Sequence, residues 1–232
     1  MLRDVSFSLE KGAIYVLMGT NGSGKTTLFN ILTGFLNADH GVCILEEKKL
    51  DHISPHLINR NGITRSFQDL RLINELTVLQ NVLLSFQGQT GENWWKALLP
   101  NHSVREQERL NIEMAIKILE KCFLTDVADS KAGEISYGQQ KLLTLACCIA
   151  NDAEVILLDE PVSGINPSYQ GKLTDIIKNL KKNGKAVLII EHNSDFVETV
   201  ADQILFLNEG VITPYKNYEA LRNDEFVQEA YI

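Results

Sequence analysis

The sequence predicts an α/β fold in which helices cover a mostly parallel sheet and a helical lobe interrupts the core. Three apolar runs, at residues 13–18, 155–158 and 187–190, have the length and composition of buried parallel strands. Helical patterns alternate with strands in roughly the first 70 and the last 90 residues, as in an α/β core. From about residue 77 to residue 150 the pattern is mostly helical, which indicates the second lobe.

The first apolar run leads into a glycine-rich loop of the kind that binds phosphates. Glycines let successive backbone N–H groups turn inward at a helix start, which makes a nest for anions. Lys25 suits the β- and γ-phosphates of a nucleotide, and the Thr26 hydroxyl suits a magnesium ion. The strand context and the Lys-Thr pair disfavour the alternative, an ordinary strand-to-helix turn. The predicted nucleotide-binding residues are Gly19, Thr20, Asn21, Gly22, Ser23, Gly24, Lys25, Thr26 and Thr27.

The middle of the chain carries the pattern of amphipathic helices. Four apolar side chains recur at every fourth position and predict one face of a long helix. These four are Leu110, Met114, Ile118 and Cys122. A second helix is predicted through Leu142 to Ile149, and Ser136 stands where its N-cap is expected.

The run at residues 155–158 ends in two acidic residues. A parallel strand delivers the residues that follow it to the carboxyl edge of the sheet, where ligands bind. Asp159 is therefore predicted to hold magnesium, directly or through water, and Glu160 to polarise an attacking water as a general base. The alternative is an acidic pair that faces solvent, which the apolar run and Pro161 disfavour.

The last part of the chain continues the strand and helix alternation. Asn166 and Pro167 suit the N-cap and first turn of a helix that Gly184 ends. Its expected buried face consists of Leu173, Ile176, Ile177 and Leu180. The third apolar run is followed by His192, and a lone histidine at a strand end is more often structural than catalytic.

Taken in order, these motifs resemble the ATP-binding-cassette ATPases over nearly the whole chain. Gln68 matches the family's Q-loop, residues 163–166 match its D-loop, and His192 matches its switch histidine. The family's signature motif corresponds to Ser136, Tyr137, Gly138 and Gln139. The spelling of this signature, the D-loop ending Gly-Ile-Asn-Pro and the segment 227–231 are similar to the ATP-binding subunits of branched-chain amino-acid importers.

The resemblance implies one nucleotide-binding domain over residues 1–232 with a phosphate-loop NTPase core. Residues 1–75 and 151–232 would form the ATP-binding core, and residues 76–150 the helical lobe that carries the signature. A small antiparallel β portion is also implied. Family members usually begin with an extra strand and an aromatic residue that stacks on adenine; this chain starts at Met1, so both are expected to be missing.

The resemblance also implies the chemistry and the partners. The reaction is hydrolysis of ATP with Mg²⁺, coupled to transport. Implied catalytic residues are Glu160, His192 and Gln68, and implied metal ligands are Thr26, Gln68 and Asp159. Each ATP would lie between one subunit's phosphate loop and the signature of a second ATPase subunit, identical or paralogous. Integral membrane permease subunits would dock near residues 69–76, unless that segment is only a connector, and a solute-binding protein would take part indirectly.

Composition sets the remaining limits. A formal net charge of −8 on 232 residues argues against non-specific nucleic-acid binding. Neither an apolar run of 18 residues nor a signal-peptide pattern is present in the sequence, so a cytoplasmic protein held at the inner membrane face by its permease is expected. The four cysteines read as reduced and mostly buried. Two other functions stay open: a soluble cassette protein outside transport, and a nucleotide-binding regulatory or scaffold subunit with weak turnover.

Overall fold

The computed structural model describes residues 2–66, 70–88 and 102–231 of the chain. Contacts divide the chain into two compact units. The first contains residues 1–68, 153–164 and 174–232, and the second contains residues 69–152 and 165–173. Residues 165–173, which the sequence assigned to the core, group with the helical unit, because Tyr169 packs against Gly138 there.

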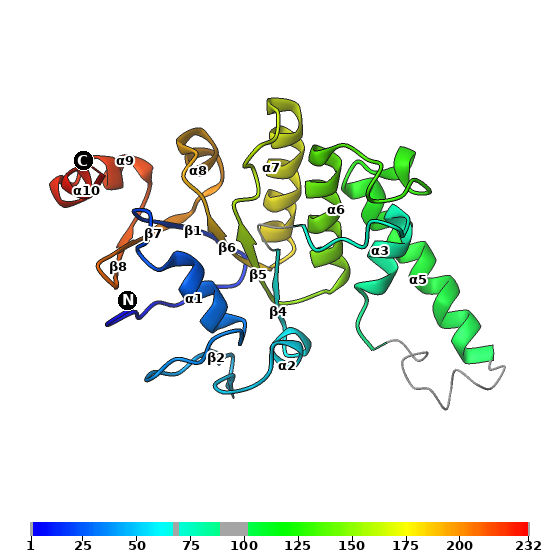
Figure 1. The fold of residues 1–232 in the computed structure, drawn as a ribbon, viewed down its shortest axis with the longest axis horizontal. Helices are drawn as coiled ribbons and strands as arrows, with labels where there is room; N and C mark the ends of the chain where they lie inside the picture. Colours follow the sequence, from blue (N-terminus) through cyan, green and yellow to red (C-terminus); the bar gives the residue numbers. More distant parts are fainter. Residues whose placement is uncertain (1, 67–69, 89–101, 232) are drawn as a thin grey trace. The chain divides into compact units, whose positions relative to one another are not determined.

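A six-stranded sheet forms the centre of the first unit (Figure 1). The order across the sheet is β4-β5-β6-β1-β7-β8; β8 pairs antiparallel with β7, and the other neighbours pair in parallel. The strands are β1 (Ile14–Met18), β4 (Ile63–Arg65), β5 (Val155–Asp159), β6 (Ala186–Ile190), β7 (Gln203–Asn208) and β8 (Val211–Tyr215). Every residue of β1, β5 and β6 is buried, which explains their apolar sequences. The predicted α/β fold class is confirmed.

Helices and a short ribbon complete the first unit. The helices are α1 (Lys25–Leu32), α2 (Pro55–Arg60), α8 (Ser194–Val200), α9 (Tyr218–Arg222) and α10 (Glu225–Tyr231). Strands β2 (Ile44–Leu45) and β3 (Lys48–Lys49) pair antiparallel, which confirms the small antiparallel portion. Leu28 and Phe29 of α1 share one hydrophobic core with Tyr15, Leu17 and Leu188 of the sheet. This packing fixes the helix that follows the glycine-rich loop against the sheet.

The strand order determines where the predicted site residues meet. Strands β4, β5, β6 and β1 are consecutive neighbours and run parallel, so their carboxyl ends lie at one edge of the sheet. The glycine-rich loop follows β1, Asp159 ends β5 with Glu160 next, and His192 comes just after β6. Segments more than 130 residues apart in sequence are therefore brought to one place.

The second unit is helical, as predicted. Its elements are α3 (Val78–Leu84), α5 (His102–Lys121), a 3₁₀ turn η2 (Thr125–Val127) and α6 (Tyr137–Ala150), with the first turns of α7 (Pro167–Lys182). Its core includes Val78 and Val82 of α3, Leu119 of α5, and Leu142 and Leu143 of α6. The buried Asn81 side chain donates to the carbonyl oxygens of Ile73 (3.1 Å) and Thr77 (2.9 Å) and thereby ties the preceding segment to α3.

The predicted apolar face of α5 was wrong in part. Leu110 and Met114 are exposed, whereas Ala115, Leu119 and Cys122 are buried. An α-helix makes one turn in about 3.6 residues, so a strict four-residue spacing drifts around the helix. The buried face instead follows spacings of four and three residues, which stay on one side.

The prediction for α7 is confirmed. The Asn166 side chain accepts a hydrogen bond from the backbone N–H of Tyr169 at 3.1 Å, as an N-cap does. Leu173, Ile176, Ile177 and Leu180 are all buried. The helix ends at Lys182, and Gly184 follows with φ of 79°.

Candidate site of nucleotide binding and hydrolysis

The loop between β1 and α1 has a backbone that requires glycine at two points. Gly19 has φ of 152°, and a Cβ built there would lie 2.2 Å from the carbonyl oxygen of Leu207. Gly24 is the N-cap of α1 with φ of 108°. Side chains larger than hydrogen are disfavoured at such angles, and at Gly19 there is also no space for one. The glycines therefore let the loop turn sharply into the start of α1, where backbone N–H groups are suited to bind an anion.

Lys25 crosses back over this loop. Its Nζ donates to the carbonyl oxygens of Gly19 and Thr20, both at 2.8 Å. Burial lowers the pKa of the Lys25 ammonium, while the charges of Glu160 and Asp159 oppose that shift. The cation is thus held between the loop and the acidic pair, where the end phosphate of a nucleotide would need it.

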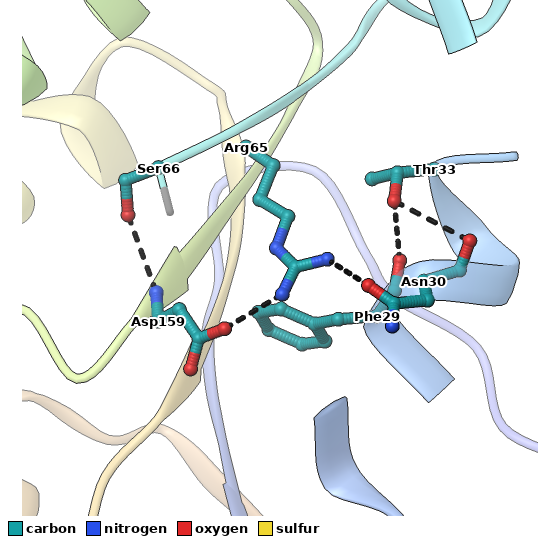
Figure 2. Close-up of polar contacts among 6 residues, drawn as sticks. All are labelled: Phe29, Asn30, Thr33, Arg65, Ser66 and Asp159. Atoms are coloured by element: carbon teal, nitrogen blue, oxygen red, sulfur yellow. Dashed lines mark hydrogen bonds and ion pairs between the residues drawn. The ribbon is translucent and has the colours of Figure 1, made fainter. Parts of the chain in front are cut away.

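Asp159 is the last residue of β5 and is buried at the edge of the sheet. Its Oδ2 accepts a hydrogen bond from the Arg65 guanidinium at 2.7 Å, and both side chains are only 5% exposed (Figure 2). Arg65 ends the neighbouring strand β4. The carboxylate predicted to hold magnesium therefore has a buried cationic partner, which the sequence alone had not indicated.

Glu160 follows β5 directly and has an unusual backbone conformation. Its φ of 47° lies in the left-handed region that glycine favours. Oε1 of Glu160 lies 3.4 Å from Nε2 of His192, whose side chain is more than half exposed. The predicted general base and the predicted switch histidine are thus neighbours at the ends of adjacent strands.

Glu191 connects the two loops that carry these residues. It is buried, and its carboxylate accepts hydrogen bonds from the backbone N–H groups of Val162 (3.1 Å), His192 (2.9 Å) and Asn193 (3.2 Å). A buried carboxylate needs such partners to offset its desolvation. Glu191 therefore fixes the chain just after Glu160 to the chain at His192.

The oxygen donors near the loop fit a hard divalent cation. Thr26, in the first turn of α1, offers an exposed hydroxyl, and Asp159 offers a carboxylate. Magnesium prefers oxygen ligands and keeps several waters or phosphate oxygens. Within the described residues no group of three or more His, Cys, Asp and Glu side chains could hold a metal by itself. Thr26 and Asp159 therefore fit a magnesium ion whose other ligands are nucleotide phosphate oxygens and waters.

The signature residues lie at the start of α6 in the second unit. Ser136 is the N-cap, as predicted, and its side chain accepts from the backbone N–H of Gln139 while Gln139 Oε1 accepts from the backbone N–H of Ser136 at 2.9 Å. A Cβ at Gly138 would lie 2.6 Å from the ring of Tyr169. The missing side chain at Gly138 therefore makes room for an aromatic ring of the same chain, a contact that the sequence pattern did not reveal.

The structure brings together most of the predicted site. The glycine-rich loop, Asp159, Glu160 and His192 share the carboxyl edge of the sheet in the first unit. The signature residues belong to the second unit. Gln68, predicted as a catalytic and metal-binding residue, lies outside the described residues. Sequence reasoning missed Arg65 and Glu191; the only available signal was a charged residue at the end of β4 in one case and just after β6 in the other.

None of the helices in the described part of the chain combines the length and the apolar character needed to cross a membrane.

Comparison with known proteins agrees with this geometry. A family model described as ABC transporter matches residues 2–163. The high-affinity branched-chain amino acid transport ATP-binding protein BraF of Pseudomonas aeruginosa is 33% identical over 229 residues, which cover 98% of this chain and 90% of BraF.

Two solved structures of ATP-binding cassettes resemble the fold. A crystal structure of the ADP conformation of a cassette from an ABC transporter has a TM-score of 0.81 and 33% identity. The match covers 99% of this chain and 91% of the cassette. A dimeric bacterial ABC transporter cassette has a TM-score of 0.74 and 25% identity, with 93% and 90% of the two chains covered.

Proposed function

The chain belongs to the ABC transporter family, and from that membership we propose that it is the ATP-hydrolysing subunit of a membrane importer for branched-chain or related hydrophobic amino acids. Membership makes it an ATP-binding-cassette ATPase. The name of BraF supports the substrate class. The transported solute itself would be recognised by the permease and by a solute-binding protein.

The proposal rests most on the pair formed by Glu160 and His192. Their 3.4 Å separation, at the edge of the sheet to which the phosphate loop is attached, suits an attack on the γ-phosphate. Glu160 accepts a proton from water as the water oxygen bonds to the γ-phosphorus, and the bond to the β-phosphate oxygen breaks to release ADP and phosphate. His192 donates to a γ-phosphate oxygen and orients the water and Glu160.

The remaining groups bind and orient the nucleotide. Backbone N–H groups of Gly19 through Thr27 and the Lys25 ammonium hold the phosphates. Thr26 and Asp159, together with Gln68, hold magnesium, which when bound neutralises charge on the β- and γ-phosphate oxygens. Magnesium usually takes one or two protein ligands and fills its other positions with phosphate oxygens and waters, so the nucleotide would supply part of its coordination.

We further propose that two ATPase subunits complete each site. The orphan N–H groups and the positive dipole end of α6 favour an anion near Ser136 and Gly138. The signature Ser136, Tyr137, Gly138 and Gln139 would contact the γ-phosphate bound by the phosphate loop of the partner subunit. The fold likeness to a dimeric cassette supports this arrangement, with a second copy or a paralogue as partner.

As an importer subunit the chain works with integral membrane permease subunits. It then lies at the cytoplasmic face of the membrane as one nucleotide-binding domain over residues 1–232. The segment at residues 69–76, of which the structure describes Leu70 to Leu76, is proposed to receive the permease. In this segment Ile73 is exposed, and its backbone is fixed by the Asn81 side chain. A net charge of −8 leaves nucleic acid an unsuitable partner.

The test is magnesium-dependent ATP hydrolysis by the purified chain over a range of protein concentrations, with Glu160→Gln as the comparison. Specific activity should rise with concentration, because two subunits complete each site. Glu160→Gln should bind ATP, accumulate as an ATP-dependent dimer, and turn over about 10²- to 10⁴-fold more slowly. Equal turnover in Glu160→Gln and the unchanged protein would remove Glu160 as the base.

A further inference from the structure

Arg65 and Asp159 form an ion pair that the ATPase chemistry described so far does not use. The guanidinium and the carboxylate are 2.7 Å apart, and each side chain is 5% exposed. Taking two charges out of water is costly, and well-packed apolar residues often replace a buried pair without loss of stability. A buried pair at the predicted metal carboxylate therefore calls for an explanation other than general stability.

The other end of the Arg65 guanidinium is also held. Its Nη1 donates to Oδ1 of Asn30 at 2.7 Å, and the guanidinium carbon lies 5.2 Å from the centre of the Phe29 ring (Figure 2). Asn30 and Phe29 belong to α1. One planar group thus joins helix α1 to the end of strand β5 through two separate nitrogens, a fixed fork that the single ammonium of a lysine lacks.

The position of Asn30 on α1 relates this bridge to the predicted metal ligands. Asn30 follows Thr26 by four residues, so both lie on the same side of the helix, about 6 Å apart along its axis. Thr26 and Asp159 are the two described residues proposed to hold magnesium. Arg65 therefore connects the two segments that supply metal ligands, and it contacts α1 one helical turn after Thr26.

Asp159 is oriented from the β4 side by two bonds. Arg65 occupies Oδ2, and the backbone N–H of Asp159 donates to the hydroxyl of Ser66 at 3.2 Å. No hydrogen bond to Oδ1 is formed by the residues that the structure describes. Arg65 therefore holds the carboxylate through Oδ2 and leaves Oδ1 as the oxygen that the proposed magnesium contact would use.

We propose that Arg65 is a positioning residue of the magnesium–nucleotide site, which sets the spacing between Asp159 and the Thr26 end of α1 by bridging Asp159 to Asn30. This inference rests on the proposed function, because it concerns the same site. Arg65 would not contact the nucleotide; it would determine how strongly Mg²⁺ increases the affinity for the nucleotide. Phosphate binding without metal depends on the loop and Lys25 and is left unchanged.

The experiment compares ATP affinity with excess Mg²⁺ and with EDTA, in chains that all carry Glu160→Gln so that ATP is consumed only slowly. The variants are Arg65→Lys, which keeps the charge but replaces the two-nitrogen fork by one ammonium, and Asn30→Ala, which keeps the ion pair and removes the bridge. Asp159→Asn is the reference for loss of the metal contact, and the exposed Arg60→Lys is the matched control.

In the parent chain Mg²⁺ should strengthen ATP binding. Loss of a group that orients a metal ligand typically costs about 10- to 100-fold in metal affinity. The Mg²⁺ enhancement should therefore fall about tenfold or more in Arg65→Lys and in Asn30→Ala, toward that of Asp159→Asn, while affinity in EDTA stays at the parent value. Arg60→Lys should match the parent in both conditions.

Other outcomes overturn the inference in ways that can be told apart. If both variants keep the parent enhancement, or lose affinity equally with and without Mg²⁺, Arg65 has no positioning role although the proposed ATP site stands. If the parent itself binds ATP without any Mg²⁺ enhancement, or does not bind ATP, the proposed site fails and the inference with it. Should Arg65→Lys not fold, Asn30→Ala decides, because it leaves the ion pair intact.

Discussion

Replacing Glu191 by glutamine should loosen the hydrolysis site and destabilise the fold by a measurable amount. The carboxylate accepts three backbone N–H groups, from Val162 on one oxygen and from His192 and Asn193 on the other. Glutamine has one oxygen and one amide nitrogen that only donates. In the better orientation of the glutamine amide, its oxygen accepts the hydrogen bonds from His192 and Asn193, and the Val162 N–H loses its acceptor. One buried unsatisfied donor costs about 1–3 kcal/mol.

Urea unfolding of the nucleotide-free chain measures this cost. Glu191→Gln should lower the free energy of unfolding by about 1–3 kcal/mol at an unchanged slope, because the surface exposed on unfolding is the same. The exposed Glu198→Gln is the matched control, since it removes the same charge from a side chain that faces solvent. Turnover should also fall, because Val162 and His192 flank the Glu160 contact, whereas ATP affinity without metal should not change. A midpoint equal to that of Glu198→Gln would refute the role given to Glu191.

Two further predictions concern the helical unit. Gly138→Ala places a Cβ 2.6 Å from the Tyr169 ring, so overpacking should lower the free energy of unfolding, measured in urea, by about 1–3 kcal/mol. In a Tyr169→Ala background that loss should nearly vanish. An equal loss in both backgrounds would contradict the contact. Burial raises the pKa of the Cys122 thiol to about 12. At pH 8 iodoacetamide should therefore leave Cys122 unmodified in the native chain and label it in urea, which peptide mass spectrometry would detect. Rapid labelling of the native chain would count against the burial of Cys122.

The fold and the acidic pair could be predicted from sequence because both depend on local patterns. A buried parallel strand is an apolar run, and the residue after it reaches the ligand-binding edge whatever the rest of the chain does. This is why Asp159 and Glu160 could be placed at the edge of the sheet before any coordinates were known. The cap at Ser136 is equally local, since it depends on four consecutive residues.

Arg65 and Glu191 could not be predicted because their partners are distant in sequence. Arg65 meets Asn30 and Asp159 only when β4 lies beside β5, and one sequence does not reveal which strands are neighbours. Glu191 has backbone partners, which leave no trace in side-chain identity. The error over the buried face of α5 has another cause. A strict four-residue repeat only approximates the helical period of about 3.6 residues, and contacts with the neighbouring helices decide which side of the helix is buried.

The backbone at Glu160 has a consequence for how this site can change over evolutionary time. A residue other than glycine at φ of 47° carries strain of the order of 1–3 kcal/mol, which the surrounding structure must sustain. Folding alone would therefore prefer glycine or asparagine at this position, whereas the general-base role proposed for Glu160 requires the carboxylate. Selection for stability and selection for turnover act on this residue in opposite directions, so a lineage freed from the need to hydrolyse nucleotide would be expected to lose Glu160 before it loses the phosphate loop.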